Sequence, residues 1–574
     1  MGIAVIKRLR IGLLVGFATA LFTGAASAAA PDEPATTKPP ASPFGAYLAG
    51  RHAQEEGEYG AAASWYEQAL RADPQSAELI SRTFMMEVDT GHFELGVPLA
   101  KKALKLDSSD AVANLVLLID QVKAGDNAGA LARAQGLPDD GLYRYVGPLA
   151  RAWMQMATGN LVGADAALQD LDKFDGFAPL KFFQLGLLYD FAGNAPKAEG
   201  FYKKALDASG PINWRLTDAM TNFYLRHGRS DQAKAIYNRF IKENSGSELA
   251  ELAAAYKSAG APPPLVASAA DGFAEALFDL ASVVNRPETL DLALLYVRCA
   301  LDLRPNLPVG QLLLADILTD QDKTERSLAV LADIPPTSRY AWSAQLRTAA
   351  NLETVGRTDQ AIAQLQAMAA KEPNRPSAQI QLGDLLRNEK RFSEAADAYS
   401  EAIKHLKTED MPPRWALYYS RGIAYERSNQ WNLAQADLEH ALELKPDQPL
   451  VLNYLGYSWI DRGEKLHRGL KMIEKAVELR PDDGYIVDSL GWAHYRLGEY
   501  STAVEYLEKA LELVPEDPTI NDHLGDAYWK SGRLSEARYQ WRRALQFKPD
   551  KEDVKPIEAK LDRGLPVTTK AGGG

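Results

Sequence analysis

The chain has 574 residues, which is too many for a single hydrophobic core and predicts either several domains or an array of units that pack on their neighbours. Hydrophobic residues make up 46% of it and the mean hydropathy is -0.27, which favours amphipathic helices over membrane spans. A net charge of -12 argues against nucleic acid as a partner. The single cysteine excludes an intramolecular disulfide and a metal site built from several thiolates.

The segment 1–28 is typical of a secretory signal peptide. Basic residues near the start precede an apolar run over 11–22 and the small-residue triplet Ala26-Ser27-Ala28. This pattern predicts export, cleavage after Ala28 to remove the segment 1–28, and a periplasmic location. An uncleaved membrane anchor is the alternative, and the protein is expected to associate with the membrane only in that case. No cysteine follows the apolar run, so we expect no lipid anchor.

Residues 29–43 are rich in Pro, Thr and Ala and predict a disordered linker. Beyond them, apolar and small residues recur with helical spacing, and the first clear unit contains Gly50 and Tyr66. We therefore predict an N-terminal array of paired helices over 44–259. Its units near 78–177 keep little beyond apolar periodicity.

A break is predicted at 260–271, where Gly260-Ala261-Pro262-Pro263-Pro264 cannot continue a helix. Middle repeats are predicted over 272–407, with a degenerate unit near 308–334. Cys299 lies in an apolar helical stretch of this region, and we expect it to be a buried core thiol.

The clearest repeats lie at 414–549. Prolines that end a unit recur with a nearly constant period: Pro446, Pro481, Pro515 and Pro549. Glycines recur with the same period, each at an equivalent place within its unit: Gly422, Gly456, Gly491 and Gly525. Residues 550–574 are predicted to form a capping helix and a disordered tail.

This pattern resembles the tetratricopeptide repeat, a helix pair of about 34 residues. Small residues at fixed positions let the two helices of a unit cross closely, and Gly463, Gly498 and Gly532 suit the left-handed turn that ends the first helix. The resemblance implies an all-α, right-handed superhelical solenoid of about fourteen helix pairs.

Catalytic and metal-binding motifs are missing from the sequence. It has no phosphate-binding loop, nucleophile elbow or zinc-binding histidine pair, and no two of its eight histidines stand at the i, i+4 spacing. We therefore predict that the protein is not an enzyme, binds no metal or cofactor, and has no small-molecule substrate.

Function in this fold is expected on the concave face, which is lined by the first helix of each pair. Tyr and Trp on such a face are the residue types that anchor protein interfaces. In the last three units the positions that face this side are Asn453, Tyr457, Asp461, Tyr485, Asp488, Trp492, Tyr495, Arg496, Asp522, Asp526, Trp529 and Lys530. The alternative for Trp492, Tyr495 and Trp529 is that they only seal neighbouring repeats.

The acidic members of this set indicate which partner the face would accept. Relatives that grip a free peptide carboxylate carry Lys and Asn at two of these positions, whereas this chain has Asp488 and Asp522 at the lysine position. A carboxylate clamp is therefore not expected. A basic or amide-rich extended segment of another protein is the better complement.

The stretches 453–463, 488–498 and 523–529 resemble the carboxy-terminal repeats of exported bacterial tetratricopeptide proteins. One of these is a lipoprotein that partners a periplasmic carboxyl-terminal processing protease and delivers cell-wall hydrolases to it. The resemblance implies a non-catalytic scaffold or adaptor for cell-envelope proteins, although this chain lacks the acylated cysteine of the lipoproteins. The alternative function is a structural component of an envelope complex that exports polysaccharide or assembles outer-membrane proteins.

Overall fold

The computed structural model describes residues 42–138, 140–244, 249, 262–406 and 414–565. The predicted signal peptide, most of the linker, the start of the Pro-rich break and the final tail lie outside these residues. The described chain contains 29 α-helices and no strand. The predicted all-α repeat solenoid is confirmed.

In the residues described up to 244 there are twelve α-helices, and one short 3-10 helix, η1 (Gln169–Lys173), follows the eighth. They form six antiparallel pairs, which we call the N-terminal array: α1 (Pro43–Glu55), α2 (Tyr59–Ala72), α3 (Ala77–Thr90), α4 (Phe93–Leu106), α5 (Ala111–Lys123), α6 (Asn127–Gln135), α7 (Tyr143–Ala157), α8 (Leu161–Leu168), α9 (Ala178–Phe191), α10 (Ala195–Ala208), α11 (Trp214–Arg226) and α12 (Ser230–Glu243).

Four further pairs, the middle pairs, follow the break: α14 (Ala269–Val284), α15 (Leu290–Leu303), α16 (Pro308–Asp320), α17 (Thr324–Ala332), α18 (Ala341–Thr354), α19 (Thr358–Lys371), α20 (Ser377–Asn388) and α21 (Phe392–His405). A short 3-10 helix, η3 (Pro287–Thr289), joins the first two.

The C-terminal array has four pairs and a single last helix: α22 (Arg414–Arg427), α23 (Trp431–Leu444), α24 (Pro449–Asp461), α25 (Leu466–Leu479), α26 (Gly484–Leu497), α27 (Tyr500–Leu513), α28 (Pro518–Lys530), α29 (Leu534–Gln546) and α30 (Lys551–Arg563).

Small residues allow the two helices of each pair to cross closely. A Cβ placed on Gly456 would lie 2.8 Å from the carbonyl oxygen of Gly469, and one on Gly525 would lie 2.5 Å from the Trp541 ring. The turn after α26 ends in Gly498 at φ 81°, a left-handed conformation that glycine adopts without strain. The small residues of the repeat therefore set the distance between the two helices, and its turn glycine allows the left-handed turn that joins them.

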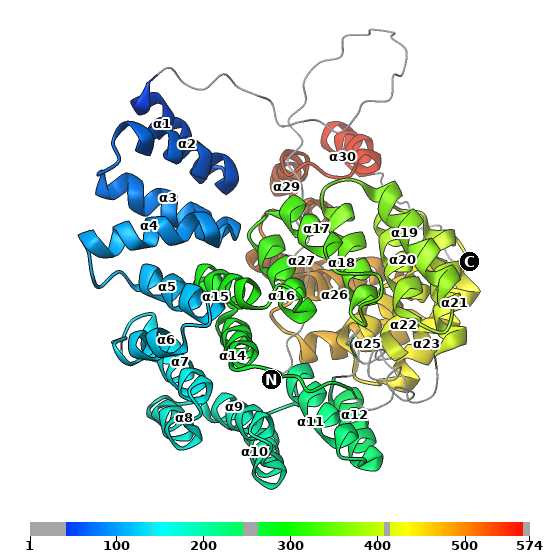
Figure 1. The fold of residues 1–574 in the computed structure, drawn as a ribbon. Coiled ribbons are helices and arrows are strands. Elements are labelled where there is room, and N and C mark those ends of the chain that lie inside the picture. Colours follow the sequence, from blue (N-terminus) through cyan, green and yellow to red (C-terminus); the bar gives the residue numbers. More distant parts are fainter. Residues whose placement is uncertain (1–41, 139, 245–248, 250–261, 407–413, 566–574) are drawn as a thin grey trace, which may run out of the picture.

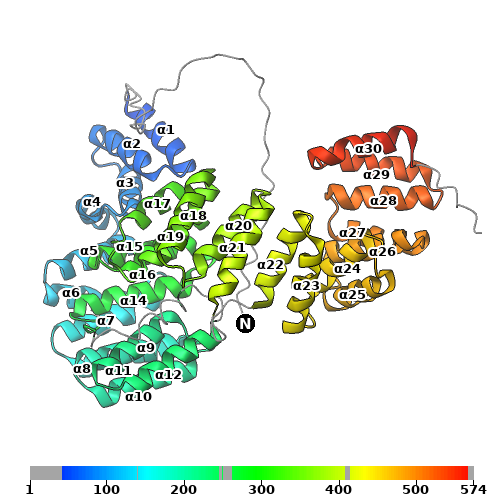
Figure 2. The same cartoon turned by 90° about the vertical axis from the view of Figure 1, so that its right-hand side faces the viewer.

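The solenoid wraps around itself. In Figures 1 and 2 the N-terminal array curves around the first middle pairs, while the C-terminal array forms a separate lobe. Helix α14 packs against α7 and α9, and α15 packs against α3 and α5. These four partners are the first helices of their pairs, so the side of the N-terminal array that the sequence assigns to partner binding is covered by the chain itself.

Apolar packing follows this arrangement. One continuous buried cluster runs from Leu70 to Ala344 and joins the N-terminal array to the first middle pairs. Cys299 is fully buried in that cluster, and burial raises the pKa of its thiol. In the C-terminal array the buried clusters are smaller and lie between neighbouring helices. The Pro-rich break in the sequence thus does not interrupt the hydrophobic core.

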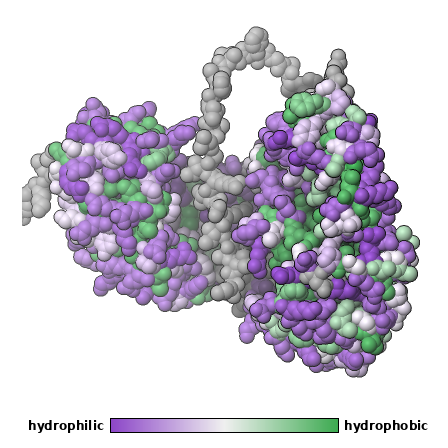
Figure 3. Space-filling view, turned by 90° about the vertical axis from the view of Figure 1, so that its left-hand side faces the viewer, coloured by the Kyte–Doolittle hydropathy of each residue, from purple (hydrophilic) through white to green (hydrophobic). Residues whose placement is uncertain are grey.

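The edge of the N-terminal array also contacts α17. The Lys323 ammonium lies 3.7 Å from the centre of the Tyr59 ring, and Arg326 donates a hydrogen bond to the backbone oxygen of Asp89 at 3.2 Å. On the face of the molecule seen in Figure 3, both lobes are mainly hydrophilic, with apolar residues in patches. Across the described helices, none is both long enough and apolar enough to cross a membrane.

Candidate protein-binding surface

All of the predicted surface residues lie on three neighbouring first helices, α24, α26 and α28, which pack side by side. Asp461 is the last residue of α24, and Lys530 is the last residue of α28. The structure therefore brings the predicted residues together on successive layers of the C-terminal array.

The carboxylates of this surface are paired across repeats. Asp461 lies 2.6 Å from Arg496 of the next pair, and Asp488 lies 3.0 Å from His523. Lys560 of α30 donates to Asp522 at 2.7 Å and to Asp526 at 2.8 Å. Each of these acidic groups thus has a basic partner one layer further along the chain.

Pairing and burial shift the pKa values of two of these groups. His523 is buried, which lowers its pKa, but the charge and hydrogen bond of Asp488 together with the charges of Asp522 and Asp526 outweigh burial, and the net pKa is raised above 6.5. Burial and the nearby charge of Asp522 raise the pKa of Asp526, against the opposing effect of Lys560. The acidic row predicted from the sequence is therefore largely neutralised within the array.

The aromatic residues form stacks on the same surface. Trp492 lies between Tyr495 and His523, with ring centres 4.6 and 4.1 Å apart and planes nearly parallel. Trp529 packs against Trp541 at 5.4 Å and against the turn at Gly564. The rings thus pack between neighbouring layers, while Trp492, Tyr495 and Trp529 stay partly exposed, and partner binding by these residues stays a prediction.

Three buried polar atoms of these surface residues have no hydrogen-bond partner in the described part of the chain: Asn453 Oδ1, Trp492 Nε1 and Asp522 Oδ1. An unpaired buried donor or acceptor costs free energy, which a bound backbone amide recovers. Tyr485, near the start of α26, has 58% of its surface exposed, whereas Tyr457 on α24 is half-buried. The surface therefore combines exposed aromatic area with unmet hydrogen-bonding groups.

The sequence did not identify the continuation of this surface into the preceding pair. Tyr454 on α24 meets Tyr419 on α22 edge-on at 5.9 Å and donates a hydrogen bond to Glu426 at 2.9 Å. The signal available in the sequence was Tyr419, which occupies the repeat position equivalent to Asn453. Aromatic side chains thus extend from α22 to α28.

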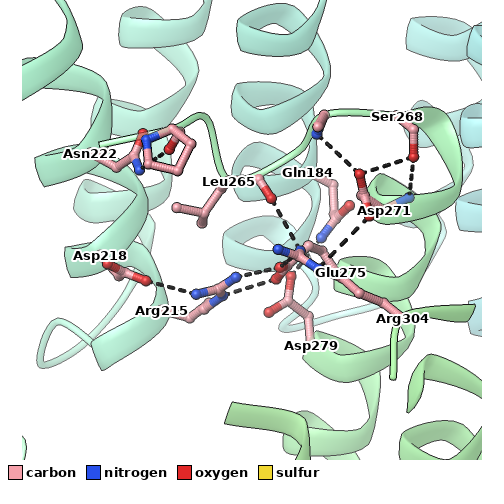
Figure 4. Close-up of polar contacts among 12 residues, drawn as sticks. Gln184, Arg215, Asp218, Asn222, Leu265, Ser268, Asp271, Glu275, Asp279 and Arg304 are labelled. Atoms are coloured by element: carbon pink, nitrogen blue, oxygen red, sulfur yellow. Dashed lines mark hydrogen bonds and ion pairs between the residues drawn. The ribbon is translucent and has the colours of Figure 1, made fainter. Parts of the chain in front are cut away.

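A second polar region, also missed, holds the wrapped part of the solenoid together (Figure 4). Arg215 of α11 pairs with Glu275 of α14 through both carboxylate oxygens and with Asp218 at 2.7 Å. Glu275 also accepts from Arg304 at 2.9 Å, and Asp218 accepts from Arg339 at 2.5 Å. Glu275 and Asp218 are completely buried.

The same region contains one carboxyl group that stands apart from these pairs. Gln184 of α9 accepts a hydrogen bond from Trp153 at 2.9 Å and donates one to Asp279 at 2.5 Å. Burial and the adjacent charge of Glu275 raise the pKa of Asp279 well above its ordinary value. The repeat pattern does not predict that these residues interact, because they come into contact only when α14 packs against the N-terminal array.

Metal-binding clusters are missing from the described residues, where no three His, Cys, Asp or Glu side chains are placed to hold a metal ion. The histidines of the candidate surface are already paired, His523 with Asp488 and His494 with Glu499. The chemistry that the surface offers is hydrogen bonding and aromatic contact.

Comparison with known families identifies the repeats. Residues 346–409 and 489–552, and separately 416–448, match models of the tetratricopeptide repeat. A TPR repeat-containing protein of Pseudomonas aeruginosa is 29% identical over 195 residues, which are 34% of this chain and 32% of that protein. Tetratricopeptide repeat protein 13 of Homo sapiens is 29% identical over 112 residues, 20% of this chain and 12% of that protein. The chain thus spans a third or less of the length of the curated relatives it matches.

Two solved structures are among those similar to this chain. The crystal structure of the APC/C hetero-tetramer Cut9–Hcn1 has a TM-score of 0.38 and 16% identity, covering 92% of this chain and 97% of that one. YrrB, described as a TPR protein with an unusual peptide-binding site, has a TM-score of 0.26 and 20% identity over 30% of this chain and 86% of its own. From the family matches and the described helices, the chain is an all-α repeat solenoid that carries tetratricopeptide repeats toward its carboxy terminus.

Proposed function

We propose that the protein is a non-catalytic periplasmic adaptor that binds an extended segment of another protein along α22, α24, α26 and α28. Tetratricopeptide repeats are typically interaction scaffolds, and the corresponding side of the N-terminal array is covered by α14 and α15. The C-terminal array is therefore the part of the solenoid that remains available to a partner.

One observation carries this proposal: the partly exposed aromatic row from Tyr419 to Trp529 contains the unpartnered atoms Asn453 Oδ1 and Trp492 Nε1. These atoms are buried in the free protein, so an extended segment meets them with its backbone N–H and C=O groups when the covering side chains move aside. The aromatic rings bury its side chains at low entropic cost.

The structure also refines the expected partner chemistry. A strongly basic segment would have to displace His523 or Lys560 from carboxylates that they already neutralise. An uncharged, amide-rich segment makes the hydrogen bonds without that cost. We therefore propose an amide-rich segment rather than a basic one.

The most concrete form of the proposal is an adaptor that brings cell-wall hydrolases to a processing protease. Pull-down from an envelope extract at physiological salt tests it, with the variant Tyr485→Ala/Trp492→Ala beside the wild type. We expect the wild type to recover a processing protease or a cell-wall hydrolase and the double variant to lose it. Tyr539→Ala, which truncates an exposed tyrosine on α29, is the matched control and should retain the partner. Recovery of neither class of protein would reject this form of the proposal.

Periplasmic location is part of the same proposal and has a separate test. Fractionation of cells, followed by sequencing of the amino terminus of the purified protein, should place it in the periplasm with Ala29 as its first residue. A chain that starts at Met1 and sediments with membranes would instead support the uncleaved anchor.

The continuous core from Leu70 to Ala344 favours a second candidate function, a fixed strut in an envelope assembly, because it joins the N-terminal array and the first middle pairs into one packed unit. Size-exclusion of a detergent extract separates the two functions. A strut stays in a large stoichiometric complex, whereas an adaptor exchanges and elutes mostly on its own.

A further inference from the structure

A cavity of about 430 Å³ lies where the N-terminal array meets the first middle pairs. Its wall includes residues of helices that are distant in sequence: α9 contributes Phe183, α11 contributes Trp214, α14 contributes Phe278 and Asp279, α16 contributes Leu312, and α18 contributes Arg347. Ligand sites in proteins have volumes of roughly 300–1,000 Å³, mostly apolar walls and a few placed polar groups. The cavity meets this description.

Asp279 is the polar group that distinguishes the cavity. Its side chain lines the wall although only 8% of the residue is exposed. One carboxyl oxygen accepts the hydrogen bond from Gln184, and the other has no hydrogen-bond partner among the described residues. A carboxyl group that is more than nine-tenths buried and half satisfied is costly unless something completes its hydrogen bonding.

The charges around the cavity balance without Asp279. Arg215 and Arg304 pair with Glu275, Arg215 and Arg339 pair with Asp218, and Arg304 also lies 3.8 Å from Asp271. Three guanidinium groups therefore face three carboxylates. In the opposite wall Arg347 and Asp316 form their own pair, with Nε 2.8 Å from the carboxylate.

An ionised Asp279 would leave this region with one unbalanced negative charge. With the cavity empty, burial and the adjacent charge of Glu275 raise the pKa of this carboxyl group and so favour its protonated form. A ligand that brings a positive charge removes this constraint, since an opposite charge within a few ångströms favours the ionised carboxylate.

We propose that this cavity binds a small organic cation, with the ammonium group against the free oxygen of Asp279 and an apolar body among Phe183, Trp214 and Phe278. The aromatic rings contribute further, because a desolvated ammonium group is attracted to ring faces. The wall offers no unpaired cation to an anionic ligand, since its guanidinium groups are already paired with carboxylates.

Isothermal titration with 2-phenylethylamine as the probe and 2-phenylethanol as its uncharged counterpart tests the proposal. We expect saturable binding of the amine and at least about tenfold weaker binding of the alcohol, as for a charge-assisted hydrogen bond. Absence of saturable amine binding, or equal affinity for the alcohol, would overturn the proposal.

The variant Asp279→Asn separates charge from shape. Its amide oxygen still accepts from Gln184, so we expect an unchanged unfolding midpoint and a loss of amine affinity of about tenfold or more. Ser282→Ala in the same wall removes a hydroxyl that donates to the Phe278 backbone oxygen, and this variant should bind the amine as the wild type does. Unchanged affinity in Asp279→Asn would refute the role of the carboxylate.

A measurement on the wild-type protein tests the proposal even if a variant does not fold. Because burial favours the protonated form of Asp279 and a bound ammonium group favours the ionised form, binding should release protons. Titration in buffers of different ionisation enthalpy measures the number released. Binding without proton release would contradict the proposed pairing.

Discussion

Gly272 shows how closely α14 approaches the N-terminal array. A Cβ at this position would lie 2.1 Å from Cζ3 of Trp153, and the Trp153 ring is fully buried with its Nε1 hydrogen-bonded to Gln184. The ring therefore has no free space into which it can move.

Gly272→Ala should destabilise the protein by about 1–3 kcal/mol, as overpacked cores do. Denaturant unfolding measures the change. Gly200→Ala is the control, because a Cβ there meets nothing within 4 Å on α10 and replacing a helical glycine by alanine stabilises by roughly 0.5–1 kcal/mol. Equal effects of the two substitutions would contradict the close approach of α14.

The pair of His523 and Asp488 makes stability depend on pH. The pKa of His523 is raised in the folded protein, so the stabilisation is fully present below the unfolded value of about 6.5 and is lost as pH rises through the folded pKa. His523→Gln should therefore cost more unfolding free energy at pH 5.5 than at pH 8.5. His52→Gln, at an exposed position on α1, is the control. A cost that does not change with pH would disprove this pairing.

At the residue scale, the sequence predicted which residues form the candidate surface but not which basic groups pair with its carboxylates. Asp488 and Trp492 could be assigned to the concave side from their repeat positions alone. Their common partner His523 lies in the next layer, as Lys560 does for Asp522 and Asp526, and whether side chains of successive layers touch depends on the twist between repeats. The spacing of the repeats along the sequence does not give that twist angle.

At the scale of elements, α14 is held by buried charge as well as by apolar contact. Glu275 is completely buried and joins α14 to Arg215 of α11 and to Arg304, which directly follows α15. The pKa of Arg215 is raised because Glu275 and Asp218 outweigh the effect of its burial. Loss of one member leaves the others charged and without compensation in the interior.

Glu275→Gln should destabilise the protein by about 3–5 kcal/mol, the usual result of removing one partner from a buried ion pair. Hydrogen exchange should show the loss first in α11 and α14. The control is Glu325→Gln, because the pair of Glu325 and Arg357 is 60% and 46% exposed and contributes at most about 1 kcal/mol. Similar losses in the two variants would rule out a locking role for Glu275.

The helix pairs were predictable wherever apolar periodicity was preserved. The regions near 78–177 and 308–334, which lack most of the repeat signature, still form the regular pairs α3–α8 and α16–α17. Local capping helps there, as when the Asp110 side chain accepts from the backbone N–H of Ala113 at 2.9 Å. The return of α14 and α15 onto α3 to α9 was not predictable, because a repeat specifies its sequence neighbours and not distant contacts.

At the scale of the whole molecule, the two lobes use the same fold differently (Figure 2). The N-terminal array buries the side that repeats commonly offer to partners, and it shares one core with the first middle pairs. The C-terminal array keeps an aromatic row partly exposed. The fold class could be read from the sequence, whereas this division of roles required the three-dimensional arrangement.

The central claim, that a partner protein binds along the C-terminal array, is tested most directly by site-specific photo-crosslinking in cells. A benzophenone amino acid is placed at Tyr485 on α26, at Trp492 on the same helix, or at Tyr539 on α29, where the exposed fraction of the side chain, 54%, is similar to the 58% of Tyr485. The account predicts discrete protein adducts from Tyr485 and Trp492 and none from Tyr539. Adducts from Tyr539 alone, or equal yields from all three sites, would contradict it.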